Sequence, residues 1–262
     1  MEREEEEEDI VCLDASFFMN NDYQLTTFAF GSHEIELLCL QSASTDFDLT
    51  GQLVWPGALL MNNYLSKHAH LLQGCSIIEL GSGVGITGIL CSKFCHNVVL
   101  TDHNEEVLKI LKQNIQLHAS PESFGNSAGL VAEKLEWGNS DQITQVIDKY
   151  SGGFDLILGA DIYILTLSSS FCSRNVEMTK SVLLLSFQQS SVPLLFETAE
   201  RLLQVRGRGK CKFILAYVSR AKIMDALILD EASRHGMQMT EVAGTRSVVG
   251  NLQGVIYEIT LK

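Results

Sequence analysis

Three glycines at alternate positions follow a short apolar strand, and they constrain the fold more than any other feature of the chain. Residues 76–80 are predicted to form the strand, Gly81, Gly83 and Gly85 follow it, and Ile86 opens a predicted helix. Glycine is needed where the backbone turns tightly or approaches a ligand with no side chain between. Such a corner between strand and helix leaves backbone amides facing a bound molecule. It predicts a pocket for an adenosine-type cofactor.

Two acids beside this corner narrow the choice of ligand. Glu79 stands two residues before the first glycine, and Asp102 ends a second predicted strand, residues 97–101. An acid at the end of that strand is placed to accept hydrogen bonds from ribose hydroxyls. The alternative for Asp102 is the N-cap of the helix that follows it. Nicotinamide- and flavin-binding proteins place their third glycine further along, so this spacing disfavours them.

Strands and helices alternate from residue 76 onward. Apolar or alternating runs predict strands at 76–80, 97–101, 130–135, 154–161 and 212–218, and an antiparallel last strand at 254–261. Helical patterns lie at 55–72, 85–95, 105–118, 141–150, 193–205 and 222–234. Repeated units of this length predict an α/β fold with a mostly parallel sheet and helices on both faces. Residues 26–37 are predicted to form a preceding β-hairpin.

The composition sets further bounds. A chain of 262 residues, 46% of them hydrophobic, is long enough for one full core, and we expect a single domain over residues 23–262. No run reaches the roughly 18 uninterrupted apolar residues of a membrane helix, so no membrane partner is expected. The seven cysteines are an odd number and lie mostly inside apolar runs. They predict buried free thiols rather than a metal site.

Cysteine usage and charge also bear on the location and partners of the protein. Free thiols and the absence of a signal-peptide pattern predict the cytoplasm, with the nucleus as a further location. The net charge is −13, and residues 2–9 hold seven acids against one arginine, which predicts a disordered tail over residues 1–22. Acidity disfavours nucleic acid as a partner and suits a basic, lysine-bearing protein. The oligomeric state is left open.

With these residues placed, the chain resembles the class I S-adenosylmethionine-dependent methyltransferases. Within that class it is most similar to the family-16 group of seven-β-strand protein-lysine methyltransferases. The resemblance runs from about residue 26 to the C-terminus and rests on Val54-Trp55-Pro56, the glycine corner, Thr101-Asp102, Leu135-Glu136-Trp137-Gly138, and the strand that ends at Ala160-Asp161. It implies a Rossmann-like, doubly wound seven-stranded sheet, S-adenosyl-L-methionine as cofactor, and methyl transfer to a lysine amine of a protein substrate.

The resemblance also implies roles in holding the cofactor. Gly81, Ser82 and Gly83 would pass beneath its methionine part and ribose, with Glu79 beside them and Asp102 accepting from the ribose hydroxyls.

Three further residues would complete the cofactor pocket. Trp137 would lie beside the adenine, Ala160 would let the cofactor approach the backbone, and Trp55 would close the pocket from the N-terminal side. For either tryptophan the alternative is an anchor in the core.

Asp161 and Tyr163 are the expected catalytic residues. A carboxylate at the end of this strand can orient the substrate amine, and an aromatic ring can hold its cationic head. The alternative for Asp161 is a cap on the following loop or helix. The family usually has its tyrosine three residues after this aspartate, whereas Tyr163 is two after Asp161. In a strand, that difference moves the ring to the opposite face.

Residues 165–189 interrupt the resemblance with a serine-rich insertion. They form either a substrate-recognition loop or an artefact of splicing or gene prediction, since long structureless loops are uncommon in compact domains.

Other functions remain open beside protein-lysine methylation. Base-amine methyltransferases resemble one another in an Asn/Asp-Pro-Pro-aromatic motif, and the Ala-Asp-Ile-Tyr at residues 160–163 lacks its prolines. A small-molecule methyltransferase and a cofactor-binding but inactive interaction module are the alternatives. A nicotinamide-dependent oxidoreductase is disfavoured by the glycine spacing.

Overall fold

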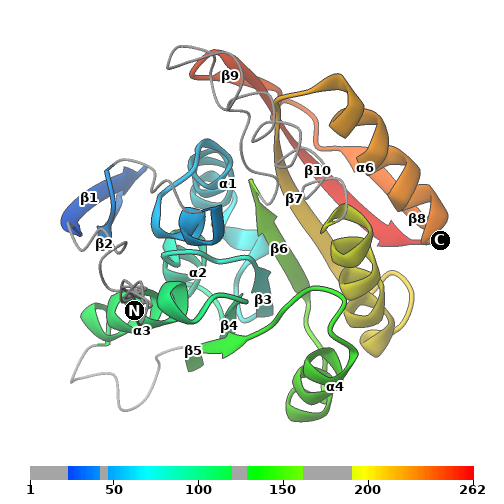
Figure 1. The fold of residues 1–262 in the computed structure, drawn as a ribbon, viewed down its shortest axis with the longest axis horizontal. Coiled ribbons are helices and arrows are strands. Elements are labelled where there is room, and N and C mark those ends of the chain that lie inside the picture. Colours follow the sequence, from blue (N-terminus) through cyan, green and yellow to red (C-terminus); the bar gives the residue numbers. More distant parts are fainter. Residues whose placement is uncertain (1–22, 42–46, 120–128, 162–190) are drawn as a thin grey trace, which may run out of the picture.

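The protein is built on a twisted central sheet with helices on both faces and a separate β-hairpin at one side (Figure 1). The computed structural model describes residues 23–41, 47–119, 129–161 and 191–262. The predicted acidic tail, Tyr163 and the predicted insertion at 165–189 lie outside the described residues.

The hairpin predicted from the sequence is confirmed. Strand β1 (Gln24–Phe30) pairs antiparallel with β2 (His33–Cys39), and Gly31 makes the turn with a φ of 61°. The buried Asn114 side chain attaches this hairpin to the rest of the fold. It accepts from Leu38 N at 2.8 Å and donates to Leu38 O at 3.0 Å and Val84 O at 2.9 Å. One side chain therefore holds the hairpin against the loop that contains the glycine corner.

The central sheet follows the order β5-β4-β3-β6-β7-β10-β8, with the short β9 paired to β10. Its first five strands are parallel, and β10 is antiparallel to its neighbours. The strands are β3 (Ser76–Leu80), β4 (Asn97–Asp102), β5 (Gly129–Lys134), β6 (Leu156–Ala160), β7 (Lys212–Ser219), β8 (Met237–Glu241), β9 (Ser247–Val249) and β10 (Leu252–Leu261). The prediction of a mostly parallel sheet with an antiparallel strand is confirmed. The resemblance implied a seventh strand in this sheet, but the residue patterns located neither β8 nor β9.

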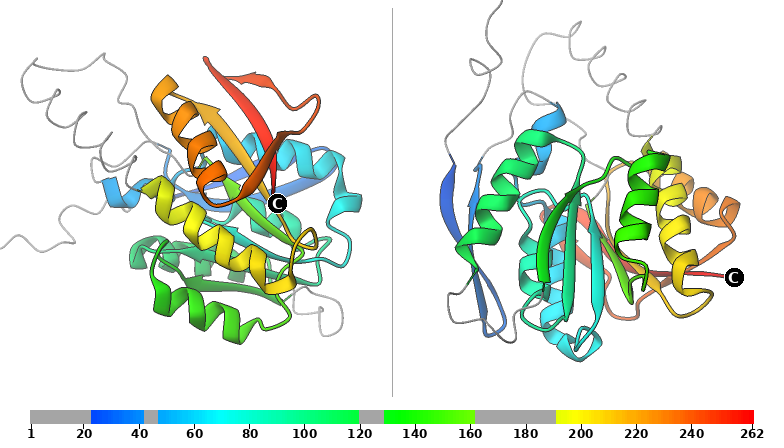
Figure 2. Two further views of the ribbon diagram at one scale, coloured as in Figure 1. Left: turned by 90° about the vertical axis from the view of Figure 1, so that its right-hand side faces the viewer. Right: turned by 90° about the horizontal axis from the view of Figure 1, so that it is seen from below.

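The helices divide between the two faces of the sheet (Figures 1 and 2). One face carries α1 (Pro56–Lys67), α2 (Ile86–Cys91) and α3 (Glu105–Leu117), and the other carries α4 (Ser140–Lys149), a helix over residues 191–206, and α6 (Lys222–Arg234). Two short 3-10 turns, Phe47–Gln52 and Ala69–Leu71, flank α1. The doubly wound arrangement is therefore confirmed. Helix α2 is shorter than predicted, because the chain leaves it in turns after Cys91.

The strand register brings three predicted site residues, Gly81, Asp102 and Ala160, to one edge of the sheet. Each follows one of three residues that lie side by side in neighbouring strands. Leu80 of β3 lies between Thr101 of β4 and Gly159 of β6, so all three strands end together. Strand order reverses here, since β4 and β6 flank β3 on opposite sides. In open α/β sheets, ligands bind in the crevice beyond such a switch point.

Two expectations from composition can be compared with the structure. All five cysteines that it describes are free thiols, four of them buried, as predicted. No helix in the described ranges has the length and apolar character needed to cross a membrane.

Candidate functional site

The glycine corner needs glycine at each of its three positions. The φ values are 66° at Gly81, 52° at Gly83 and 91° at Gly85, all in the left-handed region that side chains disfavour. Space is short as well. A Cβ on Gly83 would lie 2.7 Å from the carbonyl oxygen of Gly51, and one on Gly85 would lie 2.5 Å from a methyl of Leu111. The backbone of the corner is thus fixed from both sides.

A segment that sequence reasoning missed, Thr50-Gly51, lies against this corner. A Cβ on Gly51 would meet Val107 at 2.9 Å, so the residue is confined between α3 and the corner. The indole Nε1 of Trp55 donates to the carbonyl oxygen of Thr50 at 2.8 Å. Trp55 occupies the N-cap position of α1 and is half-buried. The isolated glycine before Trp55-Pro56 was the available sequence signal.

Asp102 faces the corner from the end of β4. Its Oδ2 accepts from Gly83 N at 3.1 Å, and its Oδ1 accepts from Asn104 N at 3.1 Å. The side chain is buried, and burial raises the pKa of its carboxyl. The N-cap of α3 is Asn104, which accepts from the amides at positions 106 and 107. The alternative of Asp102 as N-cap is therefore wrong. The His103 ring nitrogen Nδ1 lies 3.5 Å from Oδ1, and Oδ2, with the Gly83 amide as its one hydrogen-bond donor among the described residues, keeps a further acceptor position.

Glu79 and Ser82 lie inside the corner and hold it together. Glu79 is 3% exposed, and its Oε2 accepts from Gly88 N in α2 at 3.1 Å. Burial raises its pKa to about 7. The Ser82 hydroxyl donates to Glu79 O at 3.2 Å and accepts from Thr101 N at 3.0 Å. Both side chains therefore stabilise the glycine loop from its buried side.

Trp137 lies in the loop after β5, half-buried against the core beneath α4 and the 191–206 helix. Two contacts place this loop. Leu135 N donates to the carbonyl oxygen of Asp102 at 3.0 Å, and Gly138 N donates to the Thr198 hydroxyl at 2.9 Å. Gly138 has a φ of 77°, and a Cβ there would lie 2.6 Å from Leu194. Trp137 is thus tied to the backbone of the residue that faces the glycine corner.

Asp161 follows Ala160 at the end of β6 and is held by an ion pair that the sequence did not predict. Arg220 binds both carboxylate oxygens, with Nη2 at 2.8 Å from Oδ2 and Nη1 on Oδ1. The Asp161 side chain is 1% exposed and that of Arg220 is 11% exposed. The guanidinium also lies over the Trp55 ring, 5.8 Å from its centroid. This places a neutralised pair, whose carboxylate is fully buried and whose guanidinium is mostly buried, beside the predicted pocket.

The same carboxylate caps a helix distant in sequence. Gly57 N, in the first turn of α1, donates to Asp161 Oδ2 at 2.9 Å. A Cβ on Gly57 would lie 2.7 Å from that of Asp161, so only glycine allows this approach. Asp161 is also the one non-glycine residue with positive φ, 53°, among the described residues. The sequence offered a cap on the following segment as its alternative, whereas the contact is with α1.

The described residues contain no group of three or more His, Cys, Asp or Glu side chains placed to hold a metal ion. Tyr163 lies outside the described residues, so its predicted role stays a prediction.

The fold defines the class to which the chain belongs. A solved structure of the 16S ribosomal RNA methyltransferase RsmC of T. thermophilus, in complex with AdoMet and guanosine, superposes with a TM-score of 0.53. It covers 92% of this chain and 51% of that chain at 13% sequence identity. At this identity the likeness is one of fold, that of the Rossmann-like methyltransferases.

The sequence comparisons identify the family. The profile described as lysine methyltransferase matches residues 34–189, more than half of the chain. Protein N-lysine methyltransferase METTL21A of Xenopus tropicalis is 30% identical over 170 residues, covering 64% of this chain and 68% of that protein. Its Mus musculus counterpart is 34% identical over 144 residues, 54% of this chain and 59% of that protein. The chain belongs to the lysine methyltransferase family.

Proposed function

We propose that this protein transfers a methyl group from S-adenosyl-L-methionine to a lysine amine of a protein substrate. Membership of the lysine methyltransferase family supports the reaction class. The observation that carries the proposal is the meeting of Gly83 and Asp102 across the end of β3, where a buried carboxylate faces a side-chain-free backbone. That is the chemistry required by a ribose diol lying on a loop.

The residues at this edge fit such a cofactor. When bound, its sulfonium supplies an electrophilic methyl group. Asp102 holds an unused acceptor position on Oδ2 for a ribose hydroxyl. Trp137 offers a flat, half-buried face in the loop whose Leu135 amide binds the backbone of Asp102. Ala160 ends β6 without a side chain that would obstruct the approach.

The remaining cofactor residues support this pocket in other ways. Gly81 and Gly83 remove side chains from the loop, while Ser82 and Glu79 brace it from below. Trp55 closes the N-terminal side through its bond to Thr50 O.

The acceptor amine approaches from the Asp161 side of this edge. A lysine must lose its proton before it attacks, and alignment of the two reactants supplies much of the rate. The Asp161 carboxylate already receives three donors, two from Arg220 and one from Gly57 N. One acceptor position remains on Oδ1. In this proposal Asp161 orients the amine through that position, while Arg220 and Gly57 hold the carboxylate still.

A transfer assay tests the proposal. The purified chain is incubated with a cell extract and methyl-labelled S-adenosyl-L-methionine, and the products are separated into protein, nucleic acid and small molecules. Label in protein, recovered as methyl-lysine after acid hydrolysis, is the expected result, with much less from the Asp102→Asn variant at a cofactor concentration that does not saturate it. Label confined to small molecules would contradict the proposal and favour a small-molecule methyltransferase. No label in any fraction would favour an inactive interaction module.

A further inference from the structure

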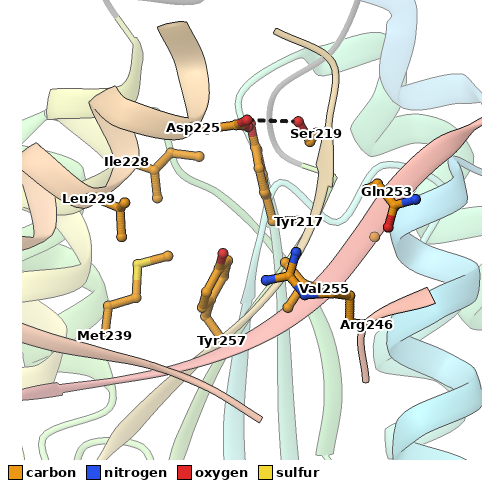
Figure 3. A pocket seen from close by; sticks show the side chains of 11 residues that line it. Tyr217, Ser219, Asp225, Ile228, Leu229, Met239, Arg246, Gln253, Val255 and Tyr257 are labelled. Atoms are coloured by element: carbon orange, nitrogen blue, oxygen red, sulfur yellow. Dashed lines mark hydrogen bonds between the residues drawn. The ribbon is translucent and has the colours of Figure 1, made fainter. Parts of the chain in front are cut away.

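A second pocket, of about 250 Å³, lies on the α6 face of the sheet (Figure 3). Its walls come from α6, from β7 and β10, and from β8 and the loop that follows β8. None of its lining residues belongs to the glycine corner or to the Asp161–Arg220 pair. The pocket is smaller than the roughly 300–1,000 Å³ typical of sites for whole small-molecule ligands. Its size suits a single extended side chain.

Asp225 of α6 gives this pocket a negative charge. Its Oδ1 accepts from the Tyr217 hydroxyl at 2.5 Å and its Oδ2 from the Ser219 hydroxyl at 3.0 Å. Both donors are neutral, and no Lys, Arg or His in the described ranges forms an ion pair with Asp225. A half-buried carboxylate is thus hydrogen-bonded but not neutralised. Each oxygen retains an acceptor position.

Arg246, a cation that lines the pocket, is already paired with an acid. Arg246 lines the opposite wall, and its guanidinium binds Glu241, with Nε at 3.1 Å from Oε1 and Nη2 on Oε2. Glu241 is outside the lining but neutralises Arg246, so Asp225 is the lining charge that no ion pair in the described ranges offsets.

Two tyrosine rings and an apolar wall complete the lining. Tyr217 and Tyr257 project into the pocket, and burial raises the pKa of both hydroxyls, so the rings stay neutral. A neutral aromatic face attracts a cation. Ile228 and Met239 supply apolar surface beside them (Figure 3). A carboxylate, tyrosine rings and an apolar wall together match the ammonium or guanidinium and the methylene stem of a basic side chain.

The end of β7 connects the pocket with the proposed reaction site. Ser219 lines the pocket and its neighbour in sequence, Arg220, binds Asp161. Consecutive residues of an extended segment point to opposite faces, so the pocket and Asp161 lie on either side of the end of β7. At the rim, Val248 pairs with Gln253 of the lining and is 65% exposed, and Leu229 is 54% exposed.

We propose that this pocket binds a lysine or arginine side chain of the protein substrate, as an anchor separate from the residue that is methylated. The inference rests on the proposed function for the identity of the partner. Its chemistry rests on Asp225 and the two tyrosine rings.

Binding is tested with the full chain carrying carbon-13 in its methionine methyl groups. The Met239 signal, assigned with a Met239→Leu variant, reports on the pocket. The probes are acetylated, amidated pentapeptides with glycine at every position except the centre, which is lysine, arginine or the uncharged norleucine. The lysine and arginine peptides are expected to shift the Met239 signal, and the norleucine peptide to leave it in place. Asp225→Asn should abolish the shift, while Asp230→Asn, which removes an exposed charge from the same helix, should preserve it.

A shift of equal size with the norleucine peptide, or an unchanged shift in Asp225→Asn, would overturn the proposal. This titration needs no methyl transfer, so its outcome is separate from that of the transfer assay. With an active protein substrate, Asp225→Asn is expected to raise KM about tenfold and to leave kcat and S-adenosylhomocysteine binding unchanged. An unaltered KM would show that the pocket is not a substrate anchor.

Discussion

Two aspartates flank β3 at the same edge of the sheet, and their surroundings differ. Asp102 receives two backbone amides, has the His103 ring 3.5 Å from Oδ1, and keeps an acceptor position on Oδ2. Asp161 receives a guanidinium on both oxygens and the amide of Gly57 on one. The Asp102 side thus keeps hydrogen-bonding capacity, which the proposed function assigns to a ligand. The Asp161 side is built first to fix three elements, β6, β7 and α1, in relation to one another.

This difference in surroundings also predicts which property a substitution near each aspartate impairs. A buried ion pair is a weak source of net stability, but removal of one partner leaves a buried charge uncompensated. A buried carboxylate without a permanent cation beside it carries its desolvation cost in the intact protein. Substitutions should therefore damage the Asp161 side through stability and the Asp102 side through ligand binding.

The largest effect is expected from Arg220→Met. It leaves Asp161 buried without its cation, which should lower the free energy of unfolding by about 3–5 kcal/mol. Urea denaturation measures the loss. Arg246→Met, which breaks an exposed pair with Glu241, serves as the control and should leave the midpoint almost unchanged. Equal midpoints for both variants would show that the Asp161–Arg220 pair does not have the predicted structural role.

A pH effect of about 3 kcal/mol is expected from Glu79, beneath the glycine corner. Its pKa is about 7 in the folded protein against an ordinary 4.5. Between these values the folded protein holds a proton that the unfolded chain has released, so stability falls as the pH rises from 4.5 to 7. Glu79→Gln removes this titration and can still accept from Gly88 N. Unfolding free energies at pH 5 and pH 8 should differ less in the variant, and an identical pH dependence would contradict the burial of a titrating carboxyl here.

Ligand affinity is expected to depend on Asp102. Asp102→Asn keeps a side-chain oxygen for a backbone amide but loses the charged acceptor, so S-adenosylhomocysteine should bind about 10- to 100-fold more weakly. The thermal midpoint should not fall, because a buried charge is removed. Calorimetry and thermal denaturation measure the two effects. Asp148→Asn, on the exposed side of α4, is the matched control. Unchanged affinity in Asp102→Asn would exclude its proposed contact with the ribose.

The smallest effect compares two glycines with similar backbone conformations. Gly83 and Gly74 have φ values of 52° and 69°, but a Cβ meets Gly51 O at 2.7 Å in the first and open space in the second. Both alanine variants carry the left-handed strain, and Gly83→Ala should cost about 1–3 kcal/mol more because of the contact. Denaturation curves of the two variants give the difference. Equal losses would mean that Thr50-Gly51 does not lie against the corner.

Local sequence patterns predicted the Asp102 side of the sheet edge well. The glycine spacing and the acid at the end of the second strand are short-range signals, and the structure places Gly83 and Asp102 in contact. Helix α6 begins and ends at the predicted residues, Lys222 and Arg234.

The Asp161 side depends on contacts between residues that are distant in sequence. Arg220 binds Asp161 across 59 positions, and Gly57 approaches it across 104. No periodicity links such positions, so neither partner could be identified from the sequence. The short strands β8 and β9 were missed for a similar reason. Four of the five residues in β8 are not fully buried, so hydrophobic patterning marks that strand weakly.

The central claim is that the edge formed by Gly83 and Asp102 binds S-adenosyl-L-methionine. Its most direct test is calorimetric titration of the purified, folded chain with S-adenosylhomocysteine, with NAD as the control ligand. The account predicts saturable binding of S-adenosylhomocysteine at one site and no binding of NAD. A folded chain that binds neither ligand, or that binds NAD instead, would contradict it.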